Sequence, residues 1–362
     1  MLRLILVNLK NTIVLAAVLF LCIPLISSTA KLITRTFFPD EDSRARLINY
    51  EKLPWAKQHF KEFNDLDIDY FGYVAWRRKP FAGSTITIDP VERIRITPPI
   101  PGLSEHRTYF FGGSTMWGSG STDDTTIPAY YQQVAREIAV NYGESGWTAH
   151  QSLNQLMKLV AEGRKPANVV FYDGANEIAH KCRVENNFFS HSNESRIDDA
   201  LEYKPTELGY YARPVISVAR SLAADLAGVP KHAKFYDCTS DARKADLVAE
   251  ALVQDWLIAR QVTELGGGRF TAFLQPIAYL SKSRLTELKL DEDLGEQFKA
   301  VYPLIRAKMI QRGIGVDLST VLDRDEFYFI DFCHVSPNGN EAVARAMKEA
   351  LSPPPTQSTT AN

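Results

Sequence analysis

The alternation of short apolar runs with longer segments of helical periodicity constrains this chain more than any other feature of its sequence. The apolar runs predict strands at residues 108–111, 138–142, 169–172, 270–274 and 314–318. The periodic segments predict helices at residues 127–136, 149–162, 212–227, 244–265, 295–311 and 337–351. Buried strands that alternate with helices form a parallel sheet covered on both faces, so we expect an α/β fold. Ligands of such sheets bind at the carboxyl ends of the strands.

The composition is that of a folded protein without the charge that nucleic acid requires. Apolar residues make up 45% of the 362 residues and charged residues 23%, which is close to the globular average and allows a sizeable core. The 41 Lys and Arg residues nearly balance the 43 Asp and Glu residues, for a net charge of −2. Because nucleic-acid binding needs a basic excess to neutralise phosphates, nucleic acid is not expected as a partner.

The first 35 residues predict the compartment. Residues 12–30 carry no charge, and as a helix they would rise about 28 Å, close to the thickness of a bilayer's hydrocarbon core. Since a short N-terminus usually stays cytoplasmic, we expect residues 1–35 to be a transmembrane signal anchor. The protein would then be a single-pass protein of the cell membrane, with its body exported to the periplasm or the exterior. The alternative is cleavage after Ala30, which would release a secreted protein.

The exported part divides into three segments. Residues 36–105 are expected to form a linker and a small β-containing appendage, residues 106–352 the main domain, and residues 353–362, which begin with three prolines, a disordered tail. The appendage is dense in aromatic side chains, for which packing against the main domain is favoured over stacking on sugar rings. These aromatic residues are Trp55, Tyr70, Phe71, Tyr73 and Trp76.

Cysteine usage fits an oxidising compartment. One of the four cysteines, Cys22, lies in the apolar N-terminal segment. Of the other three, Cys182 and Cys238 have polar, loop-like surroundings and are the candidate disulfide pair, with Cys333 left over. The alternative is that all three are free thiols. No CxxC pair and no His/Cys cluster has the spacing of a metal site, so no metal is expected.

Three polar or small residues follow the first three strands of the main domain. Gly112 and Gly113 precede Ser114 at a strand-to-helix turn, which leaves a hydroxyl exposed at the sheet edge, as a nucleophile requires. Gly146 opens toward a helix whose first N–H groups are unpaired. Asn176 carries a neutral N–H₂ group that can bond an oxyanion without titrating. Each residue taken alone is also compatible with an ordinary turn.

A carboxylate and an imidazole lie three residues apart near the end of the chain. Asp331 and His334 precede Ser336, a good helix N-cap, and Pro337, a good first helical residue. At this spacing the carboxylate can hold one ring nitrogen while the other faces outward. The pair is therefore a candidate partner for the exposed serine.

In chain order these residues are Ser, Gly, Asn and Asp-x-x-His, and the set resembles the SGNH hydrolase superfamily, also called GDSL esterases and lipases, over roughly residues 107–350. The resemblance implies a three-layer α/β/α sandwich around a parallel, flavodoxin-like five-stranded sheet. It implies a catalytic triad of Ser114, Asp331 and His334, and an oxyanion hole formed by Ser114, Gly146 and Asn176. Two positions depart from the family: Gly113 replaces the usual Asp before the serine, and Glu177 replaces the usual Asp after Asn176.

The chemistry that the resemblance implies is hydrolysis of a carboxylic ester, without a cofactor. Exported members of the superfamily often act on O-acyl groups of polysaccharides, so the expected substrate is an O-acetyl ester on a cell-surface or extracellular polysaccharide. Trp117 and Trp147 are candidate substrate-lining residues, with core packing as the alternative, and residues 180–208 are a candidate lid. Two other functions stay open: a polysaccharide O-acyltransferase that uses the same acyl-enzyme, and a non-catalytic glycan-binding or assembly scaffold.

Overall fold

The computed structural model describes residues 42–187, 189–194, 197–198 and 235–352. The expected signal anchor at residues 1–35, the expected helix at residues 212–227 and the expected tail at residues 353–362 lie outside the described residues. In the part of the chain that is described, no helix has both the length and the apolar character needed to cross a membrane.

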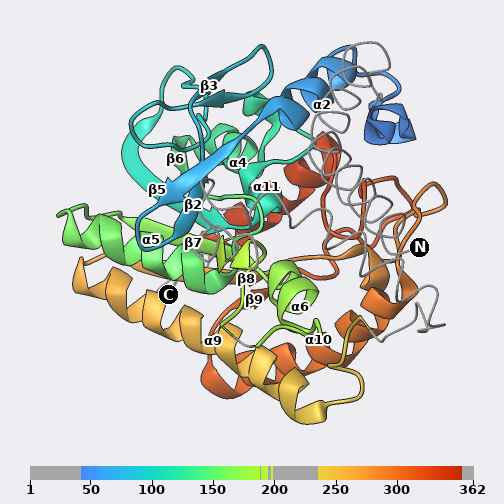
Figure 1. Cartoon of the computed structure of the whole chain (residues 1–362). Helices are drawn as coiled ribbons and strands as arrows, with labels where there is room; N and C mark the ends of the chain where they lie inside the picture. Colours follow the sequence, from blue (N-terminus) through green and yellow to red (C-terminus); the bar gives the residue numbers. More distant parts are fainter. Residues whose placement is uncertain (1–41, 188, 195–196, 199–234, 353–362) are drawn as a thin grey trace, which may run out of the picture. The chain divides into compact units, whose positions relative to one another are not determined.

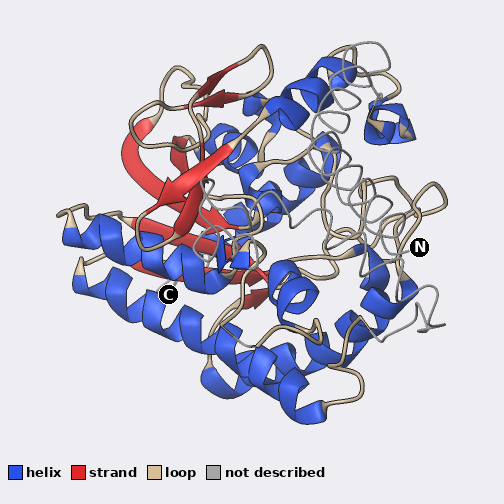
Figure 2. Ribbon diagram, viewed as in Figure 1, coloured by secondary structure: helices blue, strands red, loops and turns tan. Residues whose placement is uncertain are grey.

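A parallel sheet of five strands organises the fold (Figures 1 and 2). Its strands are β5 (Ser104–Gly112), β6 (Glu137–Asn141), β7 (Asn168–Asp173), β8 (Arg269–Leu274) and β9 (Val316–Asp317). The order across the sheet is β6-β5-β7-β8-β9, and every neighbouring pair is parallel. This order places the first strand of the sheet between the second and the third, as in flavodoxin-like folds. The expectation of a parallel, flavodoxin-like sheet is confirmed.

Helices cover both faces of this sheet and give the fold three layers. The side chains of β7 show the division, because Val169 and Phe171 join one hydrophobic core while Val170 and Tyr172 join the other. The first core is covered by α5 (Ala149–Ala161), α6 (Ala175–Lys181), α9 (Ala242–Leu265) and α10 (Glu292–Arg312). The second is covered by α4 (Ile127–Ala135) and α11 (Pro337–Leu351). Figure 1 shows α5 and α9 lying side by side.

Short polar caps fix where two of the long helices begin. Asp241 accepts a hydrogen bond from the Lys244 N–H at 2.9 Å, so α9 starts at Ala242, before the first apolar-periodic residue. Asp291 accepts from the N–H groups of Asp293 and Leu294, and α10 starts at Glu292. An acceptor at the N-cap satisfies N–H groups that the helix itself leaves unpaired. The expected starts at residues 244 and 295 were late because the apolar periodicity begins after the cap.

The appendage consists of one helix, two small hairpins and two 3-10 turns. Its elements are η1 (Ser43–Arg46), η2 (Ile48–Tyr50), α2 (Ala56–Asp65), β1 (Ile68–Phe71), β2 (Ala75–Arg78), β3 (Phe81–Ala82) and β4 (Thr87–Ile88). Three further short helices lie in the main domain: α3 (Ser114–Trp117), η3 (Asp123–Thr125) and η4 (Ala278–Leu280).

The appendage packs closely against the main domain. Residues 42–192 and those from 235 to 352 belong to one compact unit. The physical reason is that buried arginines of the appendage bond to main-chain oxygens of the main domain. Arg95 donates to the Gly118 oxygen at 2.6 Å, and Arg77 donates to the Tyr142 oxygen at 3.2 Å. Removing the appendage would take the arginine donor from each of these carbonyl groups, and the Gly118 oxygen would keep its bond from the Ser121 N–H.

The aromatic residues of the appendage have different surroundings. Trp76 is buried and its indole N–H donates to the Ser145 oxygen at 3.1 Å, in line with the expected packing against the main domain. Tyr70 and Tyr73 are 79% and 87% exposed, so these two rings do not pack against the main domain.

Candidate active site

Ser114 stands at a sharp turn between β5 and the short helix α3. Gly112, the last residue of β5, has φ +151°, and a Cβ there would lie 2.5 Å from the Tyr172 carbonyl oxygen. Only glycine allows this close approach of two backbones. Ser114 is then the first residue of α3, with 8% of its surface exposed. The turn thus presents the hydroxyl at the carboxyl end of a central strand, where α/β sheets bind their ligands.

The side chains of Ser114, His334 and Asp331 form a continuous hydrogen-bonded chain. His334 Nε2 lies 2.6 Å from Ser114 Oγ, and His334 Nδ1 lies 2.5 Å from Asp331 Oδ2. With Nδ1–H donating to the carboxylate, Nε2 is left as the acceptor for the serine proton. The structure therefore brings together three residues that are separated by up to 220 positions in the sequence.

The environment of Asp331 keeps it ionised. Burial alone would raise the pKa of this carboxyl, but the charge and hydrogen bond of His334 hold the pKa well below its usual value. The backbone N–H groups of Cys333 and His334 add to this effect by donating to Asp331 Oδ1 at 2.9 and 2.8 Å. An ionised carboxylate at this position orients the imidazole and stabilises its protonated form.

Asn176 and Gly146 belong to the two segments that flank the serine turn, those that follow β7 and β6. Asn176 is in the first turn of α6, and its Nδ2 donates to the Trp147 carbonyl oxygen at 2.7 Å. One N–H of the amide is thereby fixed, and the second remains to serve an oxyanion. A Cβ on Gly113 would lie 2.3 Å from Asn176 Nδ2, which places the amide directly against the turn that carries Ser114. Gly146 has φ +78°, in the left-handed region.

Part of the candidate lid contacts this loop. Ser192 Oγ donates to the Gly146 oxygen at 3.2 Å, and the His191 ring lies 5.1 Å from the Trp76 ring. Much of the expected lid at residues 180–208 lies outside the described residues, so its extent beyond Ser192 stays a prediction.

Trp117 and Trp147 do not line the site, contrary to the expectation that they contact substrate. Both side chains are buried, with 1% or less of their surface exposed. Arginines of the appendage cover their rings: Arg95 lies 4.4 Å from the Trp117 centroid and Arg77 lies 4.5 Å from the Trp147 centroid. These cation–π contacts occupy the faces that a sugar would need. The tryptophans belong to the packing between appendage and main domain.

Of the two alternatives for the cysteines, the structure has the candidate disulfide pair. Cys182 and Cys238 form a disulfide, and Cys333 is a buried free thiol. Cys182 is the C-cap of α6, the helix that carries Asn176 in its first turn. The disulfide therefore ties down the far end of that helix.

One group of possible metal ligands occurs in the described ranges, and it overlaps the triad. Ligand atoms of Asp331, Cys333 and His334 lie within 4.8 Å of one another. Both ring nitrogens of His334 are already engaged by Ser114 and Asp331, and burial raises the pKa of the Cys333 thiol well above its usual value. Since a metal needs a thiolate and a free nitrogen, this donor set fits proton transfer better than metal binding.

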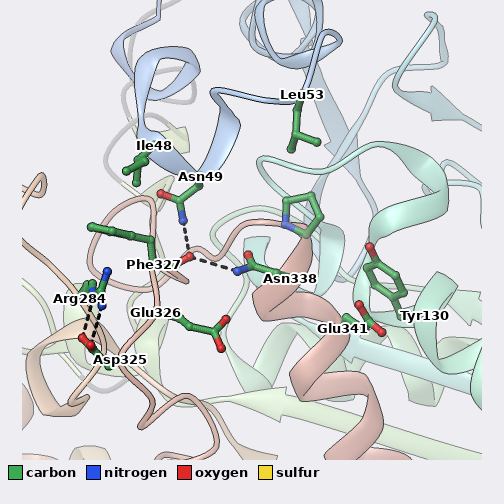
Figure 3. A pocket seen from close by; sticks show the side chains of 11 residues that line it. Ile48, Asn49, Leu53, Tyr130, Arg284, Asp325, Glu326, Phe327, Asn338 and Glu341 are labelled. Carbon is green, nitrogen blue, oxygen red and sulfur yellow. Dashed lines mark hydrogen bonds and ion pairs between the residues drawn. The ribbon is translucent and has the colours of Figure 1, made fainter.

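A separate cavity of about 460 Å³ lies beside the first turn of α11 (Figure 3). The side chains of Asn49 and Asn338 both donate to the Phe327 oxygen there, and Arg284 pairs with Asp325 at its edge. None of the candidate catalytic residues lines this cavity. It is not the site of the chemistry described above.

Two buried carboxyl groups behind Asn176 were not singled out for function from the sequence. Asp173 ends β7 and accepts from the Trp256 indole at 2.9 Å. Burial, and then the negative charge of Glu177, raise the pKa of Asp173 well above its usual value. Glu177 accepts two backbone N–H groups. The signal that could have found them is the run Asp173-Gly174-Ala175-Asn176-Glu177 itself, which places two carboxyls around the amide.

Comparisons with known proteins give matches among solved structures alone. No protein-family model matches the sequence, and no curated protein matches it. Among the solved structures that resemble the fold is a member of the lipolytic protein G-D-S-L family from Veillonella parvula DSM 2008. It has 12% sequence identity and a TM-score of 0.39, and the match covers 68% of this chain and 98% of that one. Its family is the one that the sequence motifs resemble.

Two other similar structures come from Sinorhizobium meliloti. One is a carbohydrate acetylesterase family member with 14% identity and a TM-score of 0.35, covering 68% of this chain and 97% of that one. The other is Est24, a carbohydrate acetylesterase with 12% identity and a TM-score of 0.38, covering 68% of this chain and 98% of that one. At these identities and TM-scores the likenesses assign no activity to this chain.

Proposed function

We propose that this chain is a serine esterase that hydrolyses a carboxylic ester through Ser114, His334 and Asp331. The observation that carries the proposal is the hydrogen-bonded chain from Asp331 through His334 to Ser114. A hydroxyl bonded to an imidazole, which is in turn oriented by a carboxylate, is the arrangement that activates a serine as a nucleophile. Ser114 follows the carboxyl end of β5, at the edge where α/β sheets bind their ligands.

The proposed reaction proceeds through an acyl-enzyme. His334 Nε2 takes the Ser114 proton as Oγ attacks the ester carbonyl, and the backbone N–H groups of Ser114 and Gly146 with the free N–H of Asn176 hold the oxyanion. Collapse of the tetrahedral intermediate breaks the carbonyl–oxygen bond, and the leaving alcohol takes its proton from His334. Water, deprotonated by the same imidazole, then attacks the acyl-enzyme and releases the acid and Ser114.

The substrate class follows from the resemblance to the SGNH superfamily. We propose an O-acetyl group on a cell-surface or extracellular polysaccharide. Transfer of the acetyl group to a second sugar hydroxyl would use the same acyl-enzyme, with an alcohol in place of water. Incubation of the protein with an acetylated polysaccharide, followed by measurement of free acetate and of newly acetylated acceptor, distinguishes the two. Free acetate without new acceptor ester is expected, and acetylated acceptor without free acetate would make the protein a transferase.

The test of the nucleophile is the Ser114→Ala variant. It should lose turnover of p-nitrophenyl acetate and labelling by a serine-reactive fluorophosphonate, because both reactions need Oγ. Ser119→Ala is the matched control, since it removes a buried hydroxyl five positions further along the same turn. Wild-type turnover or labelling in Ser114→Ala would show that the nucleophile is another residue, and absence of labelling in the wild type would favour a non-catalytic scaffold.

We further propose that the catalytic unit works outside the cytoplasm, tethered by residues 1–35 or released by cleavage. The disulfide between Cys182 and Cys238 supports this, because structural disulfides persist in oxidising compartments. Thiol alkylation of the protein directly after cell lysis tests the proposal. A chain in which Cys182 and Cys238 both react without prior reduction would contradict it.

A further inference from the structure

Glu177 is buried behind the candidate oxyanion hole and holds two separate loops at once. It has 1% of its surface exposed. Its Oε2 accepts from the Gly174 N–H at 2.9 Å, and its Oε1 accepts from the Ala149 N–H at 2.6 Å. The first bond is an ordinary capping-box contact, from a Glu at the third helical position to the N-cap residue of its own helix. The second bond reaches a different loop, 28 residues away in sequence.

The two loops are those that carry the candidate oxyanion donors. Ala149 begins α5, directly after the loop that contains Gly146 and Trp147. Gly174 precedes α6, which carries Asn176. The loops follow β6 and β7, which are not neighbours in the sheet, because β5, with Ser114 at its end, lies between them. A single carboxylate thus joins the loops on either side of the strand that presents the nucleophile.

The contact with Ala149 works together with a second bond in the same place. Asn176 Nδ2 donates to the Trp147 oxygen, two residues before Ala149. If the Glu177–Ala149 bond is lost, α5 and its leading loop can shift relative to α6, and the carbonyl that orients the Asn176 amide shifts with them. Displacements of about 1 Å in a catalytic group can cost about 10²-fold in rate. Stability alone would not require that both ends of the bridge lie within three residues of the oxyanion donors Gly146 and Asn176.

We propose that Glu177 is a positioning residue that sets the distance between the Gly146–Trp147 loop and Asn176, so that the oxyanion donors are in place before substrate binds. The inference rests on the proposed esterase function. It predicts that loss of the bridge lowers kcat while KM changes little, because the donors act on charge that develops in the transition state.

The experiment compares Glu177→Gln and Glu177→Ala with a matched control. Glu62 is also a buried carboxylate that accepts several backbone N–H groups, those of Ser84, Thr85 and Ile86, but it lies in the appendage. Glu62→Gln should therefore lose stability and keep kcat. For Glu177→Ala we expect kcat for p-nitrophenyl acetate to fall about 10²-fold with KM within about threefold, and a smaller fall for Glu177→Gln, whose amide oxygen still accepts one bond.

A second measurement and a third variant guard against simple misfolding. Boronic acids form a tetrahedral adduct with the serine that needs the oxyanion donors, so their affinity should fall in parallel with kcat. Ala149→Pro removes the N–H group that donates to Glu177. Residue 149 is the first position of α5, where proline is well tolerated. The preceding Thr148 has φ −92° and ψ 169°, an extended conformation that a following proline allows. This variant should show the same selective loss of kcat.

The outcomes separate the inference from the proposed function. If Ser114→Ala is inactive while folded Glu177→Gln and Ala149→Pro both keep the wild-type kcat and boronate affinity, the positioning role is wrong and the esterase stands. If Ser114→Ala keeps its activity, the esterase mechanism itself is wrong. If kcat of the Glu177 variants falls no more than kcat of Glu62→Gln, Glu177 has a structural role and does not position the oxyanion donors.

Discussion

At the scale of the residue, Gly113 shows how the absence of a side chain at one position leaves room for the side chain of another residue. The SGNH superfamily typically has Asp at this position, but here a Cβ would lie 2.3 Å from Asn176 Nδ2. Gly113 has φ −78°, so its backbone conformation does not demand glycine. The need for glycine comes from the space that Asn176 occupies. The absence of a Cβ at residue 113 thus leaves the space in which the Asn176 amide lies, directly against the serine turn.

We expect Gly113→Ala to lower kcat for an acetyl ester by about 10²-fold, because the displaced amide no longer reaches the oxyanion. The melting temperature should fall only modestly, because the closest atom is the end of the Asn176 side chain and the Trp147 carbonyl oxygen, 3.2 Å from the new Cβ, needs to shift only slightly. Gly72→Ala is the control, because nothing lies within 4 Å of a Cβ there. Steady-state kinetics and thermal unfolding of both variants test this, and an unchanged kcat in Gly113→Ala would contradict the placement of Asn176.

The residue scale also shows where sequence patterns are informative. Ser114, Asn176 and the Asp331–His334 pair could be selected as candidates because each follows a strand or precedes a helix, and such boundaries are visible in local sequence. The 2.6 Å between Ser114 and His334 could not be predicted from spacing. The choice between substrate contact and core packing for Trp117 and Trp147 could not be made from the sequence, because their exposure depends on arginines that come from another segment of the chain.

At the scale of the element, helix α2 is held to the neighbouring loop by Glu62. Its two carboxylate oxygens accept from the N–H groups of Ser84, Thr85 and Ile86 at 2.8, 2.9 and 3.1 Å. Burial opposes ionisation, but the hydrogen bonds from Thr85, Gln58 and Ser84 lower the pKa of Glu62 to about 2. The bonds therefore stabilise the fold only while the carboxyl is ionised.

This linkage predicts an acid-dependent contribution to stability. The pKa of Glu62 is lower in the folded state than its usual 4.5, so its contribution is present above that value and is lost as the pH falls toward 2. The free energy of unfolding of Glu62→Gln should lie below that of the wild type at pH 7, and the difference should shrink by pH 3. Urea denaturation at several pH values measures it. A difference that is the same at pH 3 and pH 7 would show that ionisation of Glu62 contributes nothing.

At the scale of the whole molecule, the disulfide ties together two described segments that are far apart in the sequence. Cys182 and Cys238 are 56 residues apart. In the chain-entropy description, closing a loop of this length stabilises the folded state by about 4 kcal/mol. The double variant Cys182→Ala, Cys238→Ala should unfold at a correspondingly lower urea concentration. Cys333→Ala, which removes the buried free thiol, is the control for the loss of a sulfur atom without loss of a disulfide. Equal stability of the wild type and the double variant would contradict the prediction.

The sequence by itself determined the class of fold and the candidates for chemistry. Apolar periodicity and turn residues are properties of neighbouring positions, so the parallel sheet and its helices, and with them the edge where Ser114 and Asn176 lie, could be inferred before any coordinates. The limit of that inference is seen at α9 and α10, whose predicted starts were later than the observed ones. The helix caps are polar residues, so an apolar pattern does not detect them.

The tertiary structure alone decided how distant segments complete the site. Residues from distant segments of the chain are joined by the bridge from Glu177 to Ala149, by the bond from Asn176 to Trp147, and by the contacts of Arg77 and Arg95 with two tryptophans. Such contacts depend on which side chains a fold brings within about 3 Å for a hydrogen bond and which it shields from water. Neither the distance between two side chains nor their exposure to water can be predicted from the local sequence pattern. Both are set only when the layers of the fold have packed.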